Sequence, residues 1–332
     1  MLNLKGRSFL TLKDFTPSEI RAMIDTAKQF KRNKYAGVRN EMHKGKVIAL
    51  LFEKTSTRTR CAFTVAAHDL GIRSEFLGKD DVQFGKKESV KDTAIVFGRM
   101  FDGIEFRGFK HDTVEQLAKY SGVPVWNGLT DDYHPTQVLG DFMTLEEHLA
   151  DHDIKGAKLA FVGDGRNNVA RSLMIGSALM GVDFRIGAPK DLQPKKEWVD
   201  EANALIKRYN TGAMITITED PREATAQVDA IYTDVWVSMG EEDLIADRLK
   251  LLKAYQVNRD LMESTGNPNT KFMHCLPAFH DTNTTFGKMV FEQYGQKEME
   301  VTNEVFESTA SIVFDEAENR LYTIEAVMAM TL

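Results

Sequence analysis

Short apolar runs alternate with segments of helical spacing along most of this chain. The clearest pair begins with the apolar run KVIALLFE at residues 46–53. In the segment that follows, apolar residues recur at i, i+3, i+4 and i+7, namely Phe63, Ala66, Ala67 and Leu70. That spacing puts the four side chains on one helix face. The pattern therefore predicts a buried strand followed by an amphipathic helix.

The same alternation repeats in two series. In the first half it predicts further strands at 74–78, 103–108 and 123–129, and helices at 89–100, 112–122 and 137–152. In the second half it predicts strands at 158–165, 183–189, 213–219, 229–236 and 271–277, with helices at 168–181 and 195–210. Strands that alternate with helices form parallel sheets with helices on both faces. We therefore expect an α/β protein of two doubly wound domains, each with a mainly parallel sheet flanked by helices. The two are expected to be joined by interdomain helices, with the boundary near residue 150.

Composition and charge narrow the class of protein. The chain has 332 residues, of which 42% are apolar, so it can build two ordinary domains. Its net charge of -7 argues against a nucleic-acid binder, which needs a basic surface. No apolar stretch reaches the roughly 18 residues that read as a membrane span, and the N-terminus lacks the apolar core of a signal peptide. Two cysteines, Cys61 and Cys275, form no disulfide framework, so we expect a cytoplasmic protein without membrane contact.

The stretch STRTR (56–60) is the strongest chemical signal in the chain, because it lies between the first predicted strand and its helix. A helix N-terminus carries unpaired N–H groups and a partial positive charge, so it attracts anions. Ser56, Thr57 and Thr59 add hydroxyl donors, and Arg58 adds a planar fork that suits phosphate. Helix capping needs only one of these hydroxyls. We predict a small-anion site here, and the lack of a glycine-rich Walker loop argues against an NTPase.

Two further segments of the first half have both a chemical and a structural interpretation. Arg107 ends a predicted strand, where it is either a second anion ligand or a solvated surface charge. In the segment HPTQ, His134 precedes a proline that suits a helix start. Alternatively, the His134 imidazole and the Gln137 amide donate hydrogen bonds to a carbonyl oxygen. The residues alone leave both interpretations open.

The second half offers polar side chains at several predicted strand ends. GDGRNN (163–168) lacks the third glycine of a dinucleotide-binding loop, which makes an NAD or NADP site the weaker interpretation. Asn167 and Asn168 would instead hold a small polar substrate. Asp234 either pairs with a substrate ammonium group or caps a turn. Cys275 is a candidate thiolate, a metal ligand in an incomplete His/Cys/His set, or an inert core residue.

The segments FEKTSTRTR, EFRGF, HPTQ, GDGRNN, DVWVSMGEE and HCLP occur in this order with a spacing that resembles the aspartate/ornithine carbamoyltransferase family. The resemblance runs to the final AENRLYTIEAVMAMTL and shows no departure at these motifs. STRTR with HPTQ is typical of enzymes that use carbamoyl phosphate, and SMG with HCLP points to members that act on ornithine. The resemblance implies that residues 1–150 bind carbamoyl phosphate, together with a C-terminal helix at about 318–332, and that 151–317 bind L-ornithine. It also implies a homotrimer or a larger assembly of trimers.

The same resemblance implies a role for each matched residue. Those expected to bind carbamoyl phosphate are Ser56, Thr57, Arg58, Thr59, Gln83 from a neighbouring subunit, Arg107, His134, Gln137, Cys275, Leu276 and Arg320. Those expected to bind ornithine are Asn168, Asp234, Ser238 and Met239. Arg107, His134 and Cys275 are the expected catalytic residues, and neither a metal nor a cofactor is expected. Arg60 falls further round the helix and is expected to be structural, as an ion-pair partner.

The implied reaction moves a carbamoyl group to the δ-amine of L-ornithine, giving L-citrulline and phosphate without a covalent intermediate. Charge grows on the carbonyl oxygen, where Arg107, Thr59 and His134 are the expected donors. Cys275 and Asp234 are expected to orient and deprotonate the amine. A carbamoyltransferase for another amine, such as putrescine, is the alternative, and an NAD(P)-dependent oxidoreductase is a more distant one. The sequence does not decide between arginine biosynthesis and the arginine deiminase pathway.

Overall fold

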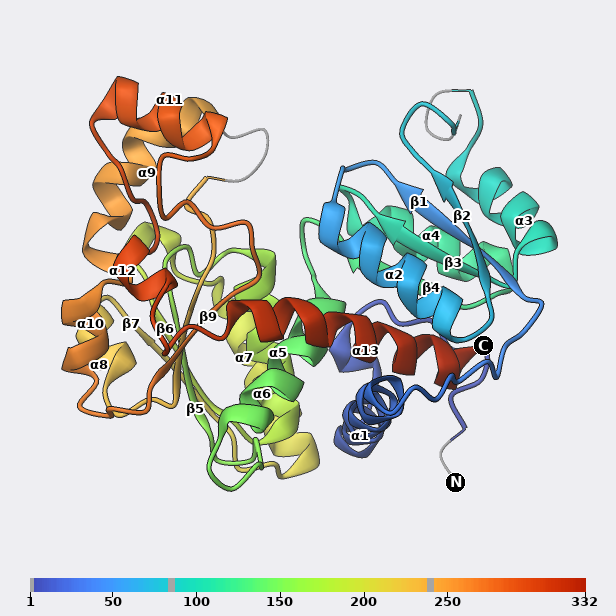
Figure 1. The fold of residues 1–332 in the computed structure, drawn as a ribbon, viewed down its shortest axis with the longest axis horizontal. Helices are drawn as coiled ribbons and strands as arrows, with labels where there is room; N and C mark the ends of the chain where they lie inside the picture. Colours follow the sequence, from blue (N-terminus) through green and yellow to red (C-terminus); the bar gives the residue numbers. More distant parts are fainter. Residues whose placement is uncertain (1–2, 83–86, 238–241) are drawn as a thin grey trace. The chain divides into compact units, whose positions relative to one another are not determined.

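A computed structural model describes residues 3–82, 87–237 and 242–332. The chain divides into two compact units, Met1–Met143 with Ala317–Leu332, and Thr144–Glu316. Each unit contains one parallel sheet with helices around it, which confirms the expected α/β class (Figure 1). None of the described helices is long and apolar enough to cross a membrane.

The first unit is built on a four-stranded parallel sheet with the order β2-β1-β3-β4. The strands are β1 (Val47–Phe52), β2 (Arg73–Leu77), β3 (Gly103–Arg107) and β4 (Val125–Leu129). The helices that connect them are α2 (Thr57–Asp69), α3 (Val90–Met100) and α4 (His111–Ser121), and α1 (Pro17–Tyr35) precedes the sheet. The apolar alternation predicted each of these strands and connecting helices, whereas α1 had not been assigned.

The two faces of this sheet bury different side chains. One face packs against α3 and α4 through an apolar cluster that includes Leu51, Ile104 and Phe106. The opposite face carries Trp126, whose ring lies 6.4 Å from that of Phe63 in α2. Side chains alternate between faces along a strand, so Glu105 and Arg107 belong to this second face as well. The second face therefore combines apolar packing with charged groups.

The second unit is built on a five-stranded parallel sheet with the order β7-β6-β5-β8-β9. Its strands are β5 (Lys158–Val162), β6 (Asp183–Gly187), β7 (Met214–Thr218), β8 (Ala230–Thr233) and β9 (Lys271–His274). Its helices are α6 (Asn168–Met180), α7 (Lys196–Tyr209), α8 (Pro221–Thr225), α9 (Ile245–Leu252), α10 (Arg259–Ser264), α11 (Thr285–Tyr294) and α12 (Asn303–Phe306). The five strands, α6 and α7 were predicted, and the other helices were not.

Two helices belong to both units. Helix α5 (Pro135–His148) begins in the first unit and ends in the second. Helix α13 (Val313–Thr331) begins in the second unit and ends in the first. The C-terminal part of α13 lies beside α1 in the first unit (Figure 1). Lys31 Nζ donates to Asn319 Oδ1 at 2.8 Å, and Tyr35 Oη donates to Glu318 Oε1 at 2.8 Å. These bonds join the beginning of the chain to its last helix.

Glu325 gives the first unit a pH-dependent stability. It is 1% exposed, and burial raises the pKa of its carboxyl to about 7, although an accepted hydrogen bond from Asn40 opposes the change. A carboxyl with a raised folded-state pKa stabilises the fold fully below its unfolded pKa, and this contribution is lost as the pH rises towards 7. We expect the melting temperature of the parent to fall relative to that of Glu325→Gln between pH 5 and pH 8. Thermal unfolding followed by circular dichroism measures this, and a constant difference between the two proteins would contradict it.

Candidate functional site

The strand order of the first sheet creates a crevice between β1 and β3. The chain leaves β1 towards β2 on one side and leaves β3 towards β4 on the other, so the two loops diverge. Ligands bind in parallel sheets at such reversals, beyond the carboxyl ends of the strands. Phe52, the last residue of β1, lies opposite Arg107, the last residue of β3. STRTR and Arg107 therefore enter the same crevice.

Helix α2 presents its N-terminus at this crevice. Ser56 is its N-cap, and the Ser56 hydroxyl accepts the backbone N–H of Thr59 at 3.2 Å. The other N–H groups of the first turn have no partner within the helix, so they suit an anion. The Thr57 side chain is exposed and that of Arg58 is half-buried. The STRTR stretch thus forms both a helix cap and a polar surface.

Thr59 links three elements through one buried hydroxyl. Its side chain is fully buried, and its Oγ1 accepts from Arg107 Nη1 at 3.2 Å and from Arg320 Nη2 at 3.0 Å. A hydroxyl can accept two hydrogen bonds and still donate one. The Thr59 O–H hydrogen is therefore directed elsewhere, and α2, β3 and α13 are joined at one oxygen. Arg320 comes from the last helix, about 260 residues away in the sequence.

His134 is a neutral donor within this positive cluster. Its side chain is 4% exposed. Burial, followed by the charges of Arg320, Arg107 and Arg58, lowers the pKa of His134 well below its usual value of 6.5. A neutral imidazole has one N–H to donate and one nitrogen that accepts. Near pH 7 the ring can donate a hydrogen bond to a ligand without carrying a positive charge.

The side chain of Asp141, one helical turn further along α5, orients Gln137. Gln137 is fully buried in α5, and its Nε2 donates to Asp141 Oδ1 at 2.8 Å. This bond uses one of the two N–H hydrogens of the amide and fixes the direction of the other. Asp141, which the sequence analysis did not single out, lies four residues further along α5. The amide is therefore held by a buried carboxylate.

The loops after β1, β3 and β4 are bonded to each other. Glu53 Oε2 accepts the backbone N–H of Phe109 at 3.1 Å. Lys54 pairs with Asp131 at 2.5 Å, and its ammonium lies 4.3 Å from the centre of the Phe109 ring. Because these contacts cross between loops, they restrain the positions of the residues that follow each strand.

Arg60 has the structural role expected of it, by a different contact. Its guanidinium lies 3.6 Å from the centre of the Phe76 ring, on the adjacent strand β2. This geometry is a cation–π interaction, whereas an ion pair had been expected. Because the Arg60 side chain is exposed, a substitution of Arg60 serves as a control for the same substitution at the neighbouring Arg58.

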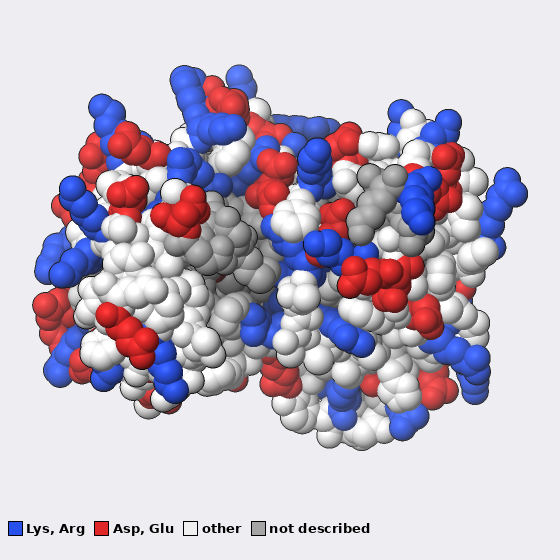
Figure 2. Space-filling view, turned by 90° about the horizontal axis from the view of Figure 1, so that it is seen from above, with Lys and Arg blue, Asp and Glu red and all other residues white. Residues whose placement is uncertain are grey.

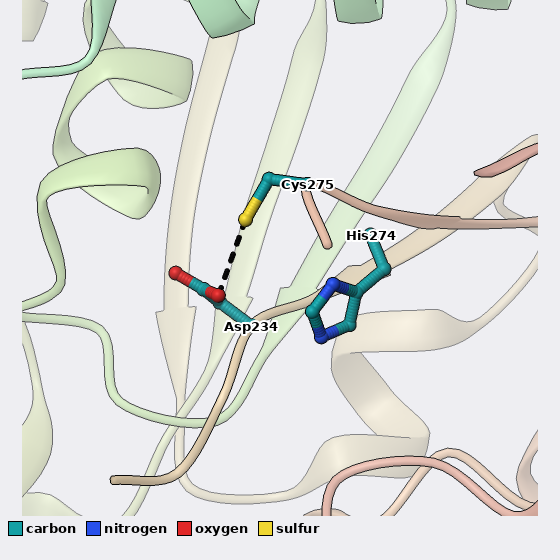
Figure 3. A group of neighbouring side chains, drawn as sticks. All are labelled: Asp234, His274 and Cys275. Atoms are coloured by element: carbon teal, nitrogen blue, oxygen red, sulfur yellow. Dashed lines mark hydrogen bonds between the residues drawn. The ribbon is translucent and has the colours of Figure 1, made fainter. Parts of the chain in front are cut away.

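The second sheet also reverses its strand order once, between β5 and β8, and polar side chains follow the strands at this point as well. Asn167 follows β5 and caps α6, and Asp234 follows β8. The Cys275 thiol, which follows β9, donates to Asp234 Oδ1 at 3.2 Å (Figure 3). Asn167 Nδ2 donates to the other oxygen, Oδ2, at 2.7 Å. Asp234 is therefore held from two sides at the carboxyl edge of this sheet.

Asn167 was expected, together with Asn168, to hold a small polar substrate, but only Asn168 was expected to bind ornithine. The Asn167 Oδ1 accepts the backbone N–H groups of Val169 and Ala170, at 2.6 and 3.3 Å. The same side chain thus caps α6 with its oxygen and contacts Asp234 with its nitrogen. An asparagine directly before a helical run is a recognisable capping signal, but the bond to Asp234 depends on the tertiary fold. Asn168 is the first residue of α6 and is half-buried.

Asp234, His274 and Cys275 also offer metal-ligand atoms, which all lie within 4.8 Å of one another (Figure 3). Hydrogen bonds already engage them. His274 Nδ1 accepts the backbone N–H of Leu276 at 2.8 Å, and its Nε2 lies 3.3 Å from Glu300 Oε1. A metal ion would have to displace these bonds and the one between Cys275 and Asp234.

Three predicted site residues, Gln83, Ser238 and Met239, lie outside the described residues. Leu276 is half-buried and, like Cys275, belongs to the second unit. Acidic and basic side chains are interspersed on the face that Figure 2 shows.

Comparison with known proteins also divides the chain into two parts. The family model described as "Aspartate/ornithine carbamoyltransferase, carbamoyl-P binding domain" matches residues 7–147. The model described as "Aspartate/ornithine carbamoyltransferase, Asp/Orn binding domain" matches residues 155–331. The second match includes most of α13, whereas spatial contacts assign Ala317–Leu332 to the first unit. The bonds of Arg320 to Thr59, of Lys31 to Asn319 and of Tyr35 to Glu318 are among the contacts that join this segment to the first unit.

Similar proteins cover nearly the whole chain. The catabolic ornithine carbamoyltransferase of Bacillus licheniformis is 60% identical over 331 residues, with 100% of this chain and 98% of the relative covered. That of Staphylococcus aureus strain N315 is 58% identical, with 99% and 97% covered. Among solved structures, the ornithine carbamoyltransferase of Pyrococcus furiosus is 40% identical with a TM-score of 0.89, over 100% of this chain and 98% of that one. The anabolic enzyme of Campylobacter jejuni is 35% identical with a TM-score of 0.85, over 97% and 98%. Both family models and these full-length matches show that the chain belongs to the aspartate/ornithine carbamoyltransferase family.

Proposed function

We propose that this protein transfers the carbamoyl group of carbamoyl phosphate to the δ-amine of L-ornithine, which gives L-citrulline and phosphate. The reaction is reversible. The observation that carries this proposal is the cluster of the buried Thr59 and Arg320 with the half-buried Arg107, beside a neutral His134. It combines an anion-binding helix N-terminus with donors for a carbonyl oxygen. This cluster lies in the unit that contains most of the match to the carbamoyl-phosphate-binding family model.

The phosphate of carbamoyl phosphate is the ligand proposed for the N-terminus of α2. Ser56, Thr57, Arg58 and Thr59 supply its donors, and Arg107 supplies a further guanidinium. Charge-assisted bonds of this kind are stronger than bonds between neutral groups. They stabilise the phosphate as a leaving group, because negative charge accumulates on it when the bond to the carbamoyl carbon breaks.

The carbamoyl oxygen is the proposed acceptor for Arg107, Thr59 and His134, with Gln137 beside the carbamoyl group. When the amine nitrogen attacks the carbamoyl carbon, the carbonyl oxygen becomes negatively charged. Fixed donors are most effective at this stage, and the loss of one typically costs roughly 10²- to 10³-fold in rate. His134 suits the task because its low pKa keeps it a neutral donor.

The amino acid is the proposed ligand of the second unit. Asp234 suits an ammonium group, and Asn168, Ser238 and Met239 complete the proposed ornithine set. The δ-amine must lose a proton before it attacks, since its free pKa is about 10. Cys275 and Asp234, which are hydrogen-bonded to each other, are the proposed groups that orient the amine and accept this proton. Leu276 and Arg320 complete the proposed carbamoyl phosphate set, to which Cys275 also belongs.

The direction of the reaction is proposed to be citrulline breakdown. Relatives that are 58–60% identical are described as catabolic, whereas the enzyme described as anabolic is 35% identical. In this direction a phosphate oxygen attacks the citrulline carbamoyl carbon, and ornithine leaves with a protonated amine. This reaction fits the arginine deiminase pathway.

The assembly is proposed to be a homotrimer, or a larger assembly of trimers, in the cytoplasm. This proposal rests on the resemblance of the chain to its family. In the proposed assembly, Gln83 of one subunit completes the phosphate site of the next.

Citrulline formation tests the activity directly. With carbamoyl phosphate and ornithine we expect citrulline and phosphate in equal amounts, and no change in NADH or NADPH absorbance. Putrescine and aspartate, offered separately at the same concentration, should be much poorer acceptors. Activity with putrescine but not with ornithine would refute the proposed substrate.

Two neighbouring arginines test the phosphate site. Arg58→Ala should raise the KM for carbamoyl phosphate roughly 10- to 100-fold, because it removes a hydrogen bond to a charged group. The matched change Arg60→Ala removes the same charge from a side chain that lies over Phe76 and should leave this KM nearly unchanged. Initial-rate kinetics at saturating ornithine measure both values. Equal increases in KM would mean that the effect comes from net charge alone.

A cysteine pair tests the proposed proton transfer. Cys275→Ser should lower kcat roughly tenfold or more and alter its pH profile, because a hydroxyl is a much weaker acid than a thiol. Cys61→Ser is the control, since Cys61 is exposed on α2. If Cys275→Ser kept both the kcat and the pH profile of the parent, the thiol would have no part in the chemistry.

A further inference from the structure

Asn167 is a helix cap with a second contact that capping does not require. Its Oδ1 accepts the backbone N–H groups of Val169 and Ala170 in the first turn of α6, at 2.6 and 3.3 Å. Its Nδ2 donates to Asp234 Oδ2 at 2.7 Å. An aspartate of the same shape would cap the helix as well, but when ionised it could not donate. The amide nitrogen therefore serves a purpose other than the cap.

The cap fixes the direction in which the Asn167 amide donates. If the amide were turned over, its NH2 group would meet the backbone N–H groups of Val169 and Ala170, and donors would face donors. Helix α6 is itself part of the core, since nearly all of its residues between Val169 and Leu179 are buried. The N–H that points to Asp234 is therefore set by a buried helix.

Asp234 depends on its partners for its orientation, because the χ2 torsion of an aspartate is broad and roughly two-fold. Among the described residues, the Val235 N–H at 2.8 Å and the Cys275 thiol at 3.2 Å share Oδ1, whereas Asn167 donates to Oδ2. Figure 3 shows one oxygen turned towards the Cys275 sulfur and the other turned away from it. A carboxylate has about four acceptor positions, so these bonds leave one position on Oδ2.

We propose that Asn167 is a positioning residue, whose amide N–H fixes Asp234 so that the remaining acceptor position of Oδ2 receives an N–H of ornithine. Asn167 thereby links two proposed ornithine ligands, because it bonds to Asp234 and directly precedes Asn168, the first residue of α6. Without this bond, the Asp234 carboxylate could turn about χ2 and present a misdirected acceptor. The inference rests on the proposed function, which supplies the substrate.

Asn167→Asp is the sharpest test, because it keeps the shape of the side chain and the capping oxygen. The new carboxylate cannot donate to Asp234, and it repels the charge of that residue. At pH 8 we expect kcat/KM for ornithine to fall roughly 10- to 100-fold, as for the loss of a hydrogen bond to a charged group. The KM for carbamoyl phosphate should stay nearly unchanged. Initial-rate kinetics of citrulline formation measure both constants.

Acid should restore part of the activity of Asn167→Asp. Two carboxyl groups that share a site hold one proton between them, and this proton supplies an O–H donor for Asp234 Oδ2. The ratio of variant to parent kcat/KM should therefore rise as the pH falls from 8 to 5.5. Both proteins share the other titratable or charged groups around this loop, namely Asp164, Arg166, Arg248, His274 and Cys275. A ratio that does not change with pH would contradict the proposal.

A capping defect is the competing explanation, and two further variants distinguish it. Asn167→Ser keeps a capping oxygen but has no atom in the position of Nδ2, whereas Asn167→Ala loses both functions. Asn167→Ser should melt near the parent temperature and still share the low kcat/KM for ornithine, and Asn167→Ala should be impaired in both. If Asn167→Ser regained the parental kinetics and Asn167→Ala did not, Asn167 would act only as a cap.

Asn258 is the matched control position. It caps α10 of the same unit, where its Oδ1 accepts the backbone N–H of Leu261 at 3.0 Å. Asn258→Asp therefore makes the same change at another helix cap. Its kinetic constants for both substrates should equal those of the parent from pH 5.5 to pH 8. A loss as large as in Asn167→Asp would show a general effect of the added charge and would refute the assignment to Asn167.

The proposed function and the positioning role fail in different ways. A parent protein that forms no citrulline from ornithine and carbamoyl phosphate rejects the activity, and with it the substrate of this inference. An active parent whose Asn167→Asp and Asn167→Ser variants keep the parental kcat/KM for ornithine rejects only the positioning role.

Discussion

Parallel strands place all their carboxyl ends at one edge of a sheet, and this constraint organises both halves of the molecule. In each sheet the strand order reverses once, between β1 and β3 and between β5 and β8. Loops that leave a reversal in opposite directions open a space that side chains from distant segments can enter. The polar motifs STRTR, GDGRNN and their partners at the ends of β3 and β8 lie at these two points. The chemistry of the family is therefore located by topology before any side chain is considered.

Electrostatics then shapes the first of these sites. Arginine side chains that converge on a buried hydroxyl repel one another, and burial strengthens the repulsion because water no longer screens it. The same positive charges act together with burial to lower the pKa of His134, so its ring stays neutral near pH 7. A bound dianion is the natural complement of such an arrangement. Under the proposed function, this complement is the phosphate of carbamoyl phosphate.

Local patterns predicted some residues of these sites better than others. The hydroxyls and arginines of STRTR stood out because a cap needs so few of them. Asp141 gave no such sequence signal, because its role depends on the hydrogen bond from Gln137, which lies one helical turn before it. The helices at Pro17–Tyr35, at Pro221–Thr225 and between Ile245 and Phe306 had also not been assigned, although the apolar spacing of a helix has the same period there.

The sequence by itself determined the α/β class, the strands, most of the helices between them and the membership of a family. These properties depend on the period of apolar residues and on short motifs, which are local along the chain. Only the tertiary structure decided that Arg320 of the last helix donates to Thr59 of α2, that Arg60 stacks on Phe76, and that Asn167 holds Asp234. These contacts join residues from separate elements, often far apart in the chain. Their geometry follows from how helices pack on a twisted sheet, and no local pattern encodes it.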